Sequence, residues 1–99
     1  MIDFNDKEKT KKLLAEKAEL FKTIAHPVRL CILAMLIKEE QSNVTDIQCC
    51  LEVPQPTISQ HLAKLKSAGI LTTERNGTEF IYKLKNEEVK KIILQIIED

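Results

Sequence analysis

The chain has 99 residues, of which 43% are hydrophobic and 30% are charged, as expected for one ordered globular domain with a modest core. Its formal net charge is zero, so overall charge gives no support to nucleic-acid binding. It lacks an apolar run near the roughly 20 residues that span a bilayer, and charge from Asp3 onward argues against a secretion signal. We therefore expect a cytoplasmic protein without membrane contact.

The first half of the sequence predicts three helices. Residues 1–12 are polar and are expected to form a partly flexible N-terminal segment of a single domain spanning residues 1–99. Apolar side chains at helical spacing then predict a helix ending near residue 24; they are Leu13, Leu14, Leu20, Phe21 and Ile24. Pro27 suits the first turn of a second helix, and the nearly unbroken apolar run 30–37 predicts that this helix is central.

A third helix is predicted to follow the polar turn of residues 38–43. Thr45-Asp46-Ile47-Gln48 matches a capping box, with Thr45 as the cap and Gln48 reaching back to it. Helical geometry predicts that Ile47, Cys50 and Leu51 face inward and that Cys49 is the more exposed of the adjacent cysteines.

The most informative stretch is residues 54–69. Ile58, Leu62 and Leu65 form one apolar stripe, and Gly69 suits the left-handed position that ends a helix. The other side carries polar groups that can bond base edges and phosphates: Thr57, Gln60, His61 and Lys64. Two short helices joined by a tight turn, the second with a polar outer face, are typical of a helix-turn-helix. Between residues 55 and 85 cations outnumber anions, so this segment is positive within a neutral chain.

The last third of the sequence predicts a hairpin and a helix. Residues 70–75 and 78–84 read as strands, and Asn76-Gly77 between them is a strong hairpin-turn signal. A two-stranded hairpin is marginal alone, so it must lean on the helices as a wing. Asn86 then caps a helix whose branched aliphatic side chains recur at helical spacing: Val89, Ile92, Ile93, Ile96 and Ile97. Covering this stripe with a second subunit is favoured over covering it with the chain's own core.

The predicted fold is mostly helical with one small hairpin, in the order of a winged helix-turn-helix. The sequence also resembles the ArsR/SmtB family of bacterial repressors over most of its length, from about residue 19 to residue 97. The resemblance is carried by an ordered series of segments: 20–33 (LFKTIAHPVRLCIL), 44–47 (VTDI), 55–65 (QPTISQHLAKL), 68–71 (AGIL), 75–78 (RNGT) and Tyr82.

The resemblance implies a homodimeric repressor that binds double-stranded DNA at an inverted-repeat operator and releases it when an inducer binds. Helix 54–68 and wing 70–84 would contact the DNA through Gln55, Thr57, Ser59, Gln60, His61, Lys64, Arg75, Asn76, Gly77 and Thr78. The first and last helices would form the dimer interface through Leu13, Leu14, Phe21, Val89, Ile92, Ile93, Ile96 and Ile97.

Known metal sites of the family are not matched here. The segment that carries a Cys-Val-Cys in many members is Asn43-Val44-Thr45, and residues 88–99 hold neither histidine nor cysteine. Pro54 also stands where the DNA-reading helix of the family usually has a Ser or Thr cap. We therefore predict no metal and no cofactor, and the absence of a nucleophile–base pair or a phosphate loop argues against an enzyme.

Three cysteines leave two interpretations open. Cys31, Cys49 and Cys50 are candidates for a thiol- or redox-responsive site, although the C-terminal cysteine that one redox-sensing branch of the family pairs with a cysteine of the second helix is absent. The simpler interpretation, which we prefer, places Cys31 and Cys50 in the core and leaves Cys49 an ordinary surface thiol. A different class of function, a winged helix that contacts other proteins, is favoured mainly by the zero net charge.

Overall fold

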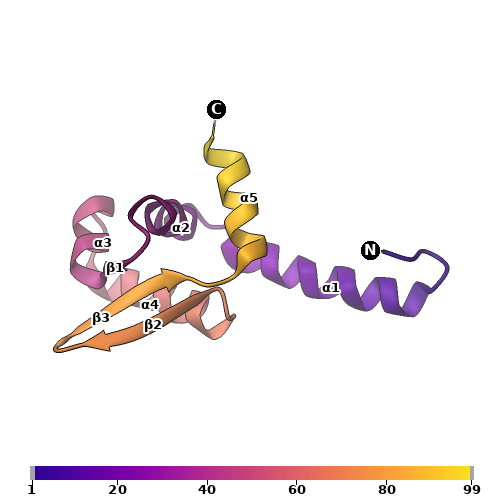
Figure 1. The fold of residues 1–99 in the computed structure, drawn as a ribbon, viewed down its shortest axis with the longest axis horizontal. Coiled ribbons are helices and arrows are strands. Elements are labelled where there is room, and N and C mark those ends of the chain that lie inside the picture. The colour runs from indigo at the N-terminus through magenta and orange to yellow at the C-terminus, as the bar shows by residue number, and fades with distance from the viewer. Residues whose placement is uncertain (1, 99) are drawn as a thin grey trace.

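The structure is a computed structural model and describes residues 2–98. Its elements, in chain order, are α1 (Lys7–Ile24), α2 (Pro27–Glu39), β1 (Ser42–Asn43), α3 (Val44–Leu51), α4 (Gln55–Ser67), β2 (Leu71–Asn76), β3 (Glu79–Leu84) and α5 (Glu87–Ile97). The winged helix-turn-helix predicted from the sequence is confirmed, with one added strand. Figure 1 shows α2, α3, α4 and the sheet as a body from which α1 and α5 project in different directions.

The core of the chain lies around α2 and α4. Its fully or almost fully buried side chains are Ile24, Ile32, Leu33, Leu36, Ile47, Ile58, Leu62, Leu65, Ile70, Leu71, Val89 and Ile93. The apolar stripe predicted for residues 54–69 is therefore confirmed, and α2 is central because α3, α4, α5 and β3 all contact it. No single helix within residues 2–98 is long and apolar enough to cross a membrane; α1 and α2 pass that test together, but as a pair bent by 90°.

Two predictions about the core are wrong. Cys31 and Cys50, expected inside, are both exposed, as is Cys49. An unbroken apolar run in α2 does not reveal which face is buried, and that face proves to carry Ile32, Leu33 and Leu36. In α3, Ile47 is buried and Leu51 half-buried, but the helix turns both cysteines away from the core.

Helix α1 starts earlier than its apolar pattern predicted. The side chain of Asp6 accepts a hydrogen bond from the Lys9 N–H at 3.1 Å, so the helix begins at Lys7 rather than near Leu13. An N-cap and helix-forming residues are sufficient to extend a helix beyond its packed part. The N-terminal half of α1 consequently extends away from the body of the molecule (Figure 1).

The start of α3 also corrects a prediction. Asn43, not Thr45, is the N-cap: its side-chain oxygen accepts from the Asp46 N–H at 2.7 Å. The segment before it was predicted to be a polar turn, yet Ser42 and Asn43 form β1, which pairs antiparallel with β3. This pairing holds Asn43 in an extended conformation, as an N-cap residue requires.

We expect Asn43→Ala to lower the free energy of unfolding by about 1 kcal/mol, because it removes the side-chain acceptor at this helix start. Thr45→Ala, the matched control in the first turn, should change the free energy by less than about 0.5 kcal/mol. Urea denaturation of both variants measures this difference. Equal losses, or a larger loss for Thr45→Ala, would restore Thr45 as the cap.

The wing is the β2–β3 hairpin, and it is confirmed with its turn displaced by one residue. The strands pair from Leu71 opposite Leu84 to Asn76 opposite Glu79, which leaves Gly77 and Thr78 as the loop. Gly77 has a φ of 67°, which glycine adopts without the Cβ penalty of other residues. Because β1 pairs with the other edge of β3, the sheet has the order β1-β3-β2 and ties the wing to the start of α3.

Helix α5 begins where its sequence suggests, but part of its aliphatic stripe packs against the chain's own core. The Asn86 side chain accepts from the Val89 N–H at 3.0 Å, which confirms Asn86 as the cap. The Lys17 ammonium in α1 lies 2.7 Å from the Glu88 carboxylate and joins the two projecting helices near their crossing. Val89 and Ile93 on the inner side of α5 are fully buried within the chain, whereas Ile96 and Ile97 beyond them are exposed.

Candidate nucleic-acid interface

Helix α4 separates an apolar face from a polar one. Ile58, Leu62 and Leu65 are fully buried, so they fix the rotation of the helix about its axis. Gln60 and Lys64, four residues apart, therefore lie together on the outward side, and both are exposed. An amide and an ammonium on one exposed helical face have the chemistry to bond a base edge and a phosphate in a major groove.

The start of α4 has no side-chain cap, as Pro54 predicted. The Pro54 carbonyl instead accepts from the N–H groups of Thr57 at 3.0 Å and Ile58 at 3.1 Å. Pro56 in the first turn has no N–H to satisfy. The prolines thus reduce the number of donors left at this helix end, and the preceding turn closes with Glu52 in the left-handed conformation at φ 53°.

The side chains predicted to contact DNA are not equally available. In α4, Gln55, Ser59, Gln60 and Lys64 are exposed, whereas Thr57 and His61 are half-buried. At the wing, Arg75, Asn76, Gly77 and Thr78 are all exposed. The exposed side chains predicted to contact DNA thus form two groups, one on α4 and one at the wing tip. His61 belongs to neither group.

His61 points toward the corner between α1 and α2. Its Nδ1 accepts a hydrogen bond from Arg29 Nε at 3.1 Å, and its ring centroid lies 4.5 Å from that of His26. Burial, and after it the nearby His26 and Arg29, lower the pKa of His61 below its ordinary value of 6.5. His61, which is predicted to contact DNA, therefore already has a hydrogen-bond partner within the chain, Arg29.

Arg29 is the residue that the sequence analysis missed. It also donates from Nη1 to the carbonyl oxygen of Thr23 at 2.8 Å, so one guanidinium connects the end of α1, the first turn of α2 and the middle of α4. The available signal was a lone cation in the otherwise apolar first turns of α2, from Pro27 to Ile37. That signal does not identify the partner, which is 32 residues away in the sequence.

Internal contacts order the wing tip. Arg75 Nε donates to the Gly77 carbonyl at 3.1 Å, and its guanidinium lies 5.9 Å from the centre of the Phe80 ring on the paired strand. On the other side of the loop, Asn43 Nδ2 donates to the carboxylate of Glu79, the first residue of β3, at 3.1 Å. Side-chain contacts therefore hold the tip half of the wing, one of them to the start of α3.

All three cysteines are exposed, which removes the structural reason for preferring a core role. Cys49 and Cys50 line a hollow of about 300 Å³ with Met35, Ser42 and Asp46 among its other residues. Residues 2–98 contain no group of three or more His, Cys, Asp or Glu side chains placed to hold a metal ion. The thiol-responsive alternative stays a prediction, and the comparison of DNA affinity before and after peroxide treatment tests it.

The predicted dimer residues divide into two sets. Leu14, Phe21, Ile96 and Ile97 are between 45% and 59% exposed, and Leu13 and Ile92 are half-buried. Val89 and Ile93 are wholly inside the chain and have no surface to offer a second copy, so their assignment to an interface is wrong. Four apolar side chains left uncovered on the two projecting helices are a large exposed set for a small domain.

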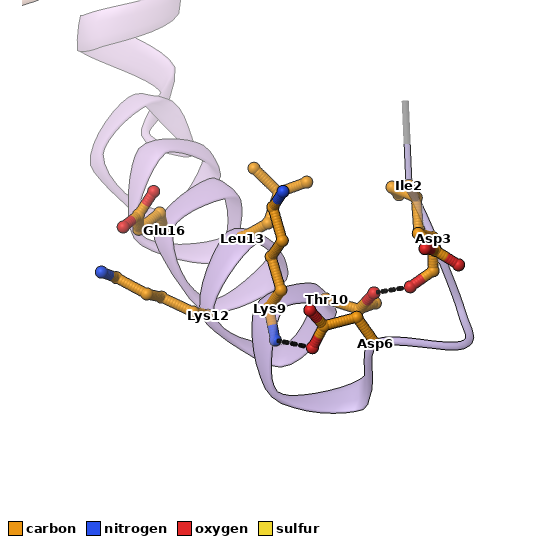
Figure 2. A pocket seen from close by; sticks show the side chains of 8 residues that line it. All are labelled: Ile2, Asp3, Asp6, Lys9, Thr10, Lys12, Leu13 and Glu16. Carbon is orange, nitrogen blue, oxygen red and sulfur yellow. Dashed lines mark hydrogen bonds between the residues drawn. The ribbon is translucent and has the colours of Figure 1, made fainter.

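A second hollow, of about 370 Å³, lies where the N-terminal arm folds back onto α1. Figure 2 shows the Thr10 hydroxyl donating to the Asp3 carbonyl and Asp6 capping the helix at its edge. Three acidic and two basic side chains line it, so the lining carries a formal charge of only −1. Its contacts account for the burial of Thr10, which is 8% exposed.

Comparison with known proteins places this geometry in a family. Residues 26–73 match the model of the bacterial regulatory proteins of the arsR family. The transcriptional repressor PagR of Bacillus anthracis is 45% identical over 80 residues, which are 81% of this chain and 80% of PagR. The transcriptional repressor SmtB of Mycobacterium tuberculosis is 39% identical over 87 residues, which are 88% of this chain; the chain spans only 64% of SmtB.

Solved structures agree with the sequence match. The crystal structure of PagR superimposes with a TM-score of 0.79 at 42% identity, over 87% of this chain and 98% of PagR. Reduced HlyU from Vibrio cholerae gives a TM-score of 0.85 at 30% identity, over 93% of this chain and 99% of HlyU. The chain belongs to the ArsR family of bacterial regulatory proteins and has the winged helix-turn-helix fold of its DNA-binding transcriptional repressors.

Proposed function

We propose that two copies of this chain form a repressor that binds an inverted-repeat operator in the cytoplasm of a prokaryotic cell. Helix α4 enters the major groove, and the wing contacts the backbone or minor groove beside it. The observation that carries this proposal is the division of α4, with Ile58, Leu62 and Leu65 buried and Gln60 and Lys64 on the exposed side. Similarity to named repressors supports it.

The dimer part of the proposal rests on exposed apolar surface. Leu14 and Phe21 on α1 and Ile96 and Ile97 on α5 are about half exposed, although each is apolar. Burying such side chains against a second copy would contribute about 25 cal/mol for each Å² removed from water. Because α1 projects from the body, a second copy can pack along it without disturbing the core (Figure 1).

A winged helix that contacts proteins is the second candidate, favoured by a net charge of zero. Against it, Lys64, Lys66, Arg75, Lys83 and Lys85 place positive charge on α4 and the wing, where only Glu74 and Glu79 oppose it. Phosphate binding depends on this local charge, and such binding weakens steeply as salt rises.

Selection of duplexes from a random-sequence pool by the full chain separates the two candidates. We expect an enriched inverted repeat with half-site centres about 34–36 Å apart, bound less tightly as salt increases. The spacing follows from two identical reading helices related by a twofold axis. A pool that shows no enrichment, or retention that is insensitive to salt, would favour the protein-binding candidate.

A further inference from the structure

One guanidinium links α4 to α2 and to the end of α1. Arg29 donates from Nη1 to the carbonyl of Thr23 in the last turn of α1, and from Nε to Nδ1 of His61 in α4. The distances are 2.8 Å and 3.1 Å. No other hydrogen bond recorded within residues 2–98 joins a side chain of α4 to another element.

This bond requires an unprotonated nitrogen on His61. A guanidinium is always protonated and only donates, so Nδ1 of His61 must supply the lone pair. Next to it, His26 uses its own Nδ1 to accept from the Val28 N–H at 3.1 Å, and its ring packs against His61 at 4.5 Å. Protonation of His61 would therefore break the bond to Arg29 and place a second cationic group beside its guanidinium.

The surroundings of His61 offer no anion to stabilise a positive ring. Burial and the nearby His26 and Arg29 all lower its pKa from the ordinary 6.5. Lys64 follows one turn later on the same helix and adds further positive charge. Each element packed against α4 carries carboxylates, but no hydrogen bond or ion pair recorded within residues 2–98 joins His61 to any of them, for example Glu19 on α1, Glu39 on α2, Asp46 on α3 or Glu74 on β2.

We propose that Arg29 is a positioning residue for DNA binding, which holds α4 through His61, and that protonation of His61 in mild acid breaks this hold and weakens binding. The proposal rests on the assignment of α4 as the DNA-reading helix. Its consequence is a regulator whose affinity for DNA decreases as the pH is lowered.

The sign of the pH effect distinguishes this role from the DNA contact predicted earlier. A neutral His61 is favoured in the folded arrangement, so the arrangement is fully stable above about pH 6.5 and loses stability as the pH falls below that value. If His61 instead faced a phosphate, the anion would favour the protonated ring, and acid would strengthen binding. The two roles give opposite slopes.

The wild-type chain first selects a duplex from the random pool at about pH 7.5. The affinity of each variant for this duplex, labelled with a fluorophore, is then measured by fluorescence anisotropy at about pH 7.5 and about pH 5.5, at constant ionic strength. Wild type should lose about three- to tenfold in affinity in acid. His61→Gln should change less than about twofold between the two pH values. Arg29→Gln should bind more weakly than wild type at the higher pH and respond less to acid.

Two further variants separate position from charge. Arg29→Lys keeps the charge but not the two-pronged geometry, so it should not restore the wild-type affinity or pH profile. Lys22→Gln removes an exposed cation from the neighbouring end of α1, and this variant should keep the wild-type affinity and the wild-type pH profile. A wild-type affinity that rises in acid, an equal acid loss in His61→Gln, or an unchanged profile in Arg29→Gln would overturn the proposal.

A measurement without DNA keeps the test independent of the proposed function. The chain has two histidines, so an NMR titration can follow both imidazole signals. The His26→Gln variant lacks one signal and so identifies the other as that of His61. The pKa of His61 should lie below 6.5 in wild type and rise in Arg29→Gln. If no duplex is recovered by wild type, the proposed function fails, whereas a wild-type titration unaltered by Arg29→Gln contradicts the hydrogen bond itself.

Discussion

Replacing Ile97 by Asp should convert the proposed dimer into monomers at micromolar concentration. Ile97 is 45% exposed on α5, so the chain should fold normally with a carboxylate at this position. In a dimer the same carboxylate would be buried without a partner, which costs several kcal/mol. We expect the dissociation constant of the dimer to rise about a hundredfold or more, since each 1.4 kcal/mol is a factor of ten.

Analytical ultracentrifugation over a range of concentrations measures this change, because it compares the mass of the variant in solution with the 11.3 kDa of one chain. Phe21→Asp, at a 51% exposed position on α1, should act in the same way. The matched control is Gln95→Asp, which adds the same charge to an exposed position on α5 but removes no apolar side chain. Variants at Ile97 and Phe21 that sediment like wild type would remove α1 and α5 from the interface.

Loss of the dimer should also weaken DNA binding. Two linked reading helices bind an inverted repeat far more tightly than one, because the second contact is made at high effective concentration. We therefore expect Ile97→Asp to bind the selected duplex about a hundredfold less tightly. This expectation makes the interface testable through DNA as well as through mass.

The second large effect is expected from the double variant Gln60→Ala with Lys64→Ala. Both side chains are exposed on one face of α4, and each base-edge contact contributes about 1–3 kcal/mol of discrimination. Removal of both should lower the affinity for the selected duplex about a hundredfold, with the fold unchanged because the buried face of α4 is intact.

The single variants should differ in kind. Gln60→Ala should relax preference at one position of each half-site, whereas Lys64→Ala should weaken all sequences alike and reduce the salt dependence. Lys91→Ala removes the same charge from α5, which points away from α4 and the wing in Figure 1, and should bind like wild type. A double variant with wild-type affinity would mean that another surface binds the DNA.

The fold could be predicted wherever local signals were decisive. The stripe of Ile58, Leu62 and Leu65, the left-handed Gly69 just beyond α4 and the Asn86 cap all act within a few residues of themselves. The choice between Asn43 and Thr45 could not be made in this way, because both are capping residue types. Pairing of Ser42 and Asn43 with β3, almost 40 residues later, makes the choice.

The site was less predictable because its contacts join distant parts of the chain. Helical spacing places His61 beside the polar face of α4, but only packing against the α1–α2 corner brings it within reach of Arg29. Likewise, the aliphatic stripe of α5 gives no sign of where the core ends, and the structure divides it between buried Ile93 and exposed Ile97. Periodicity identifies a face, whereas the three-dimensional fold determines what covers it.

Hydroxyl-radical footprinting of the full chain on its selected duplex tests most directly whether two copies present α4 to DNA. Two equal protected patches, related by a twofold axis and centred about one helical turn apart, are expected, and the double change at Gln60 and Lys64 should remove both patches. A single protected patch, or two patches that persist in the double variant, would contradict the paired arrangement of α4.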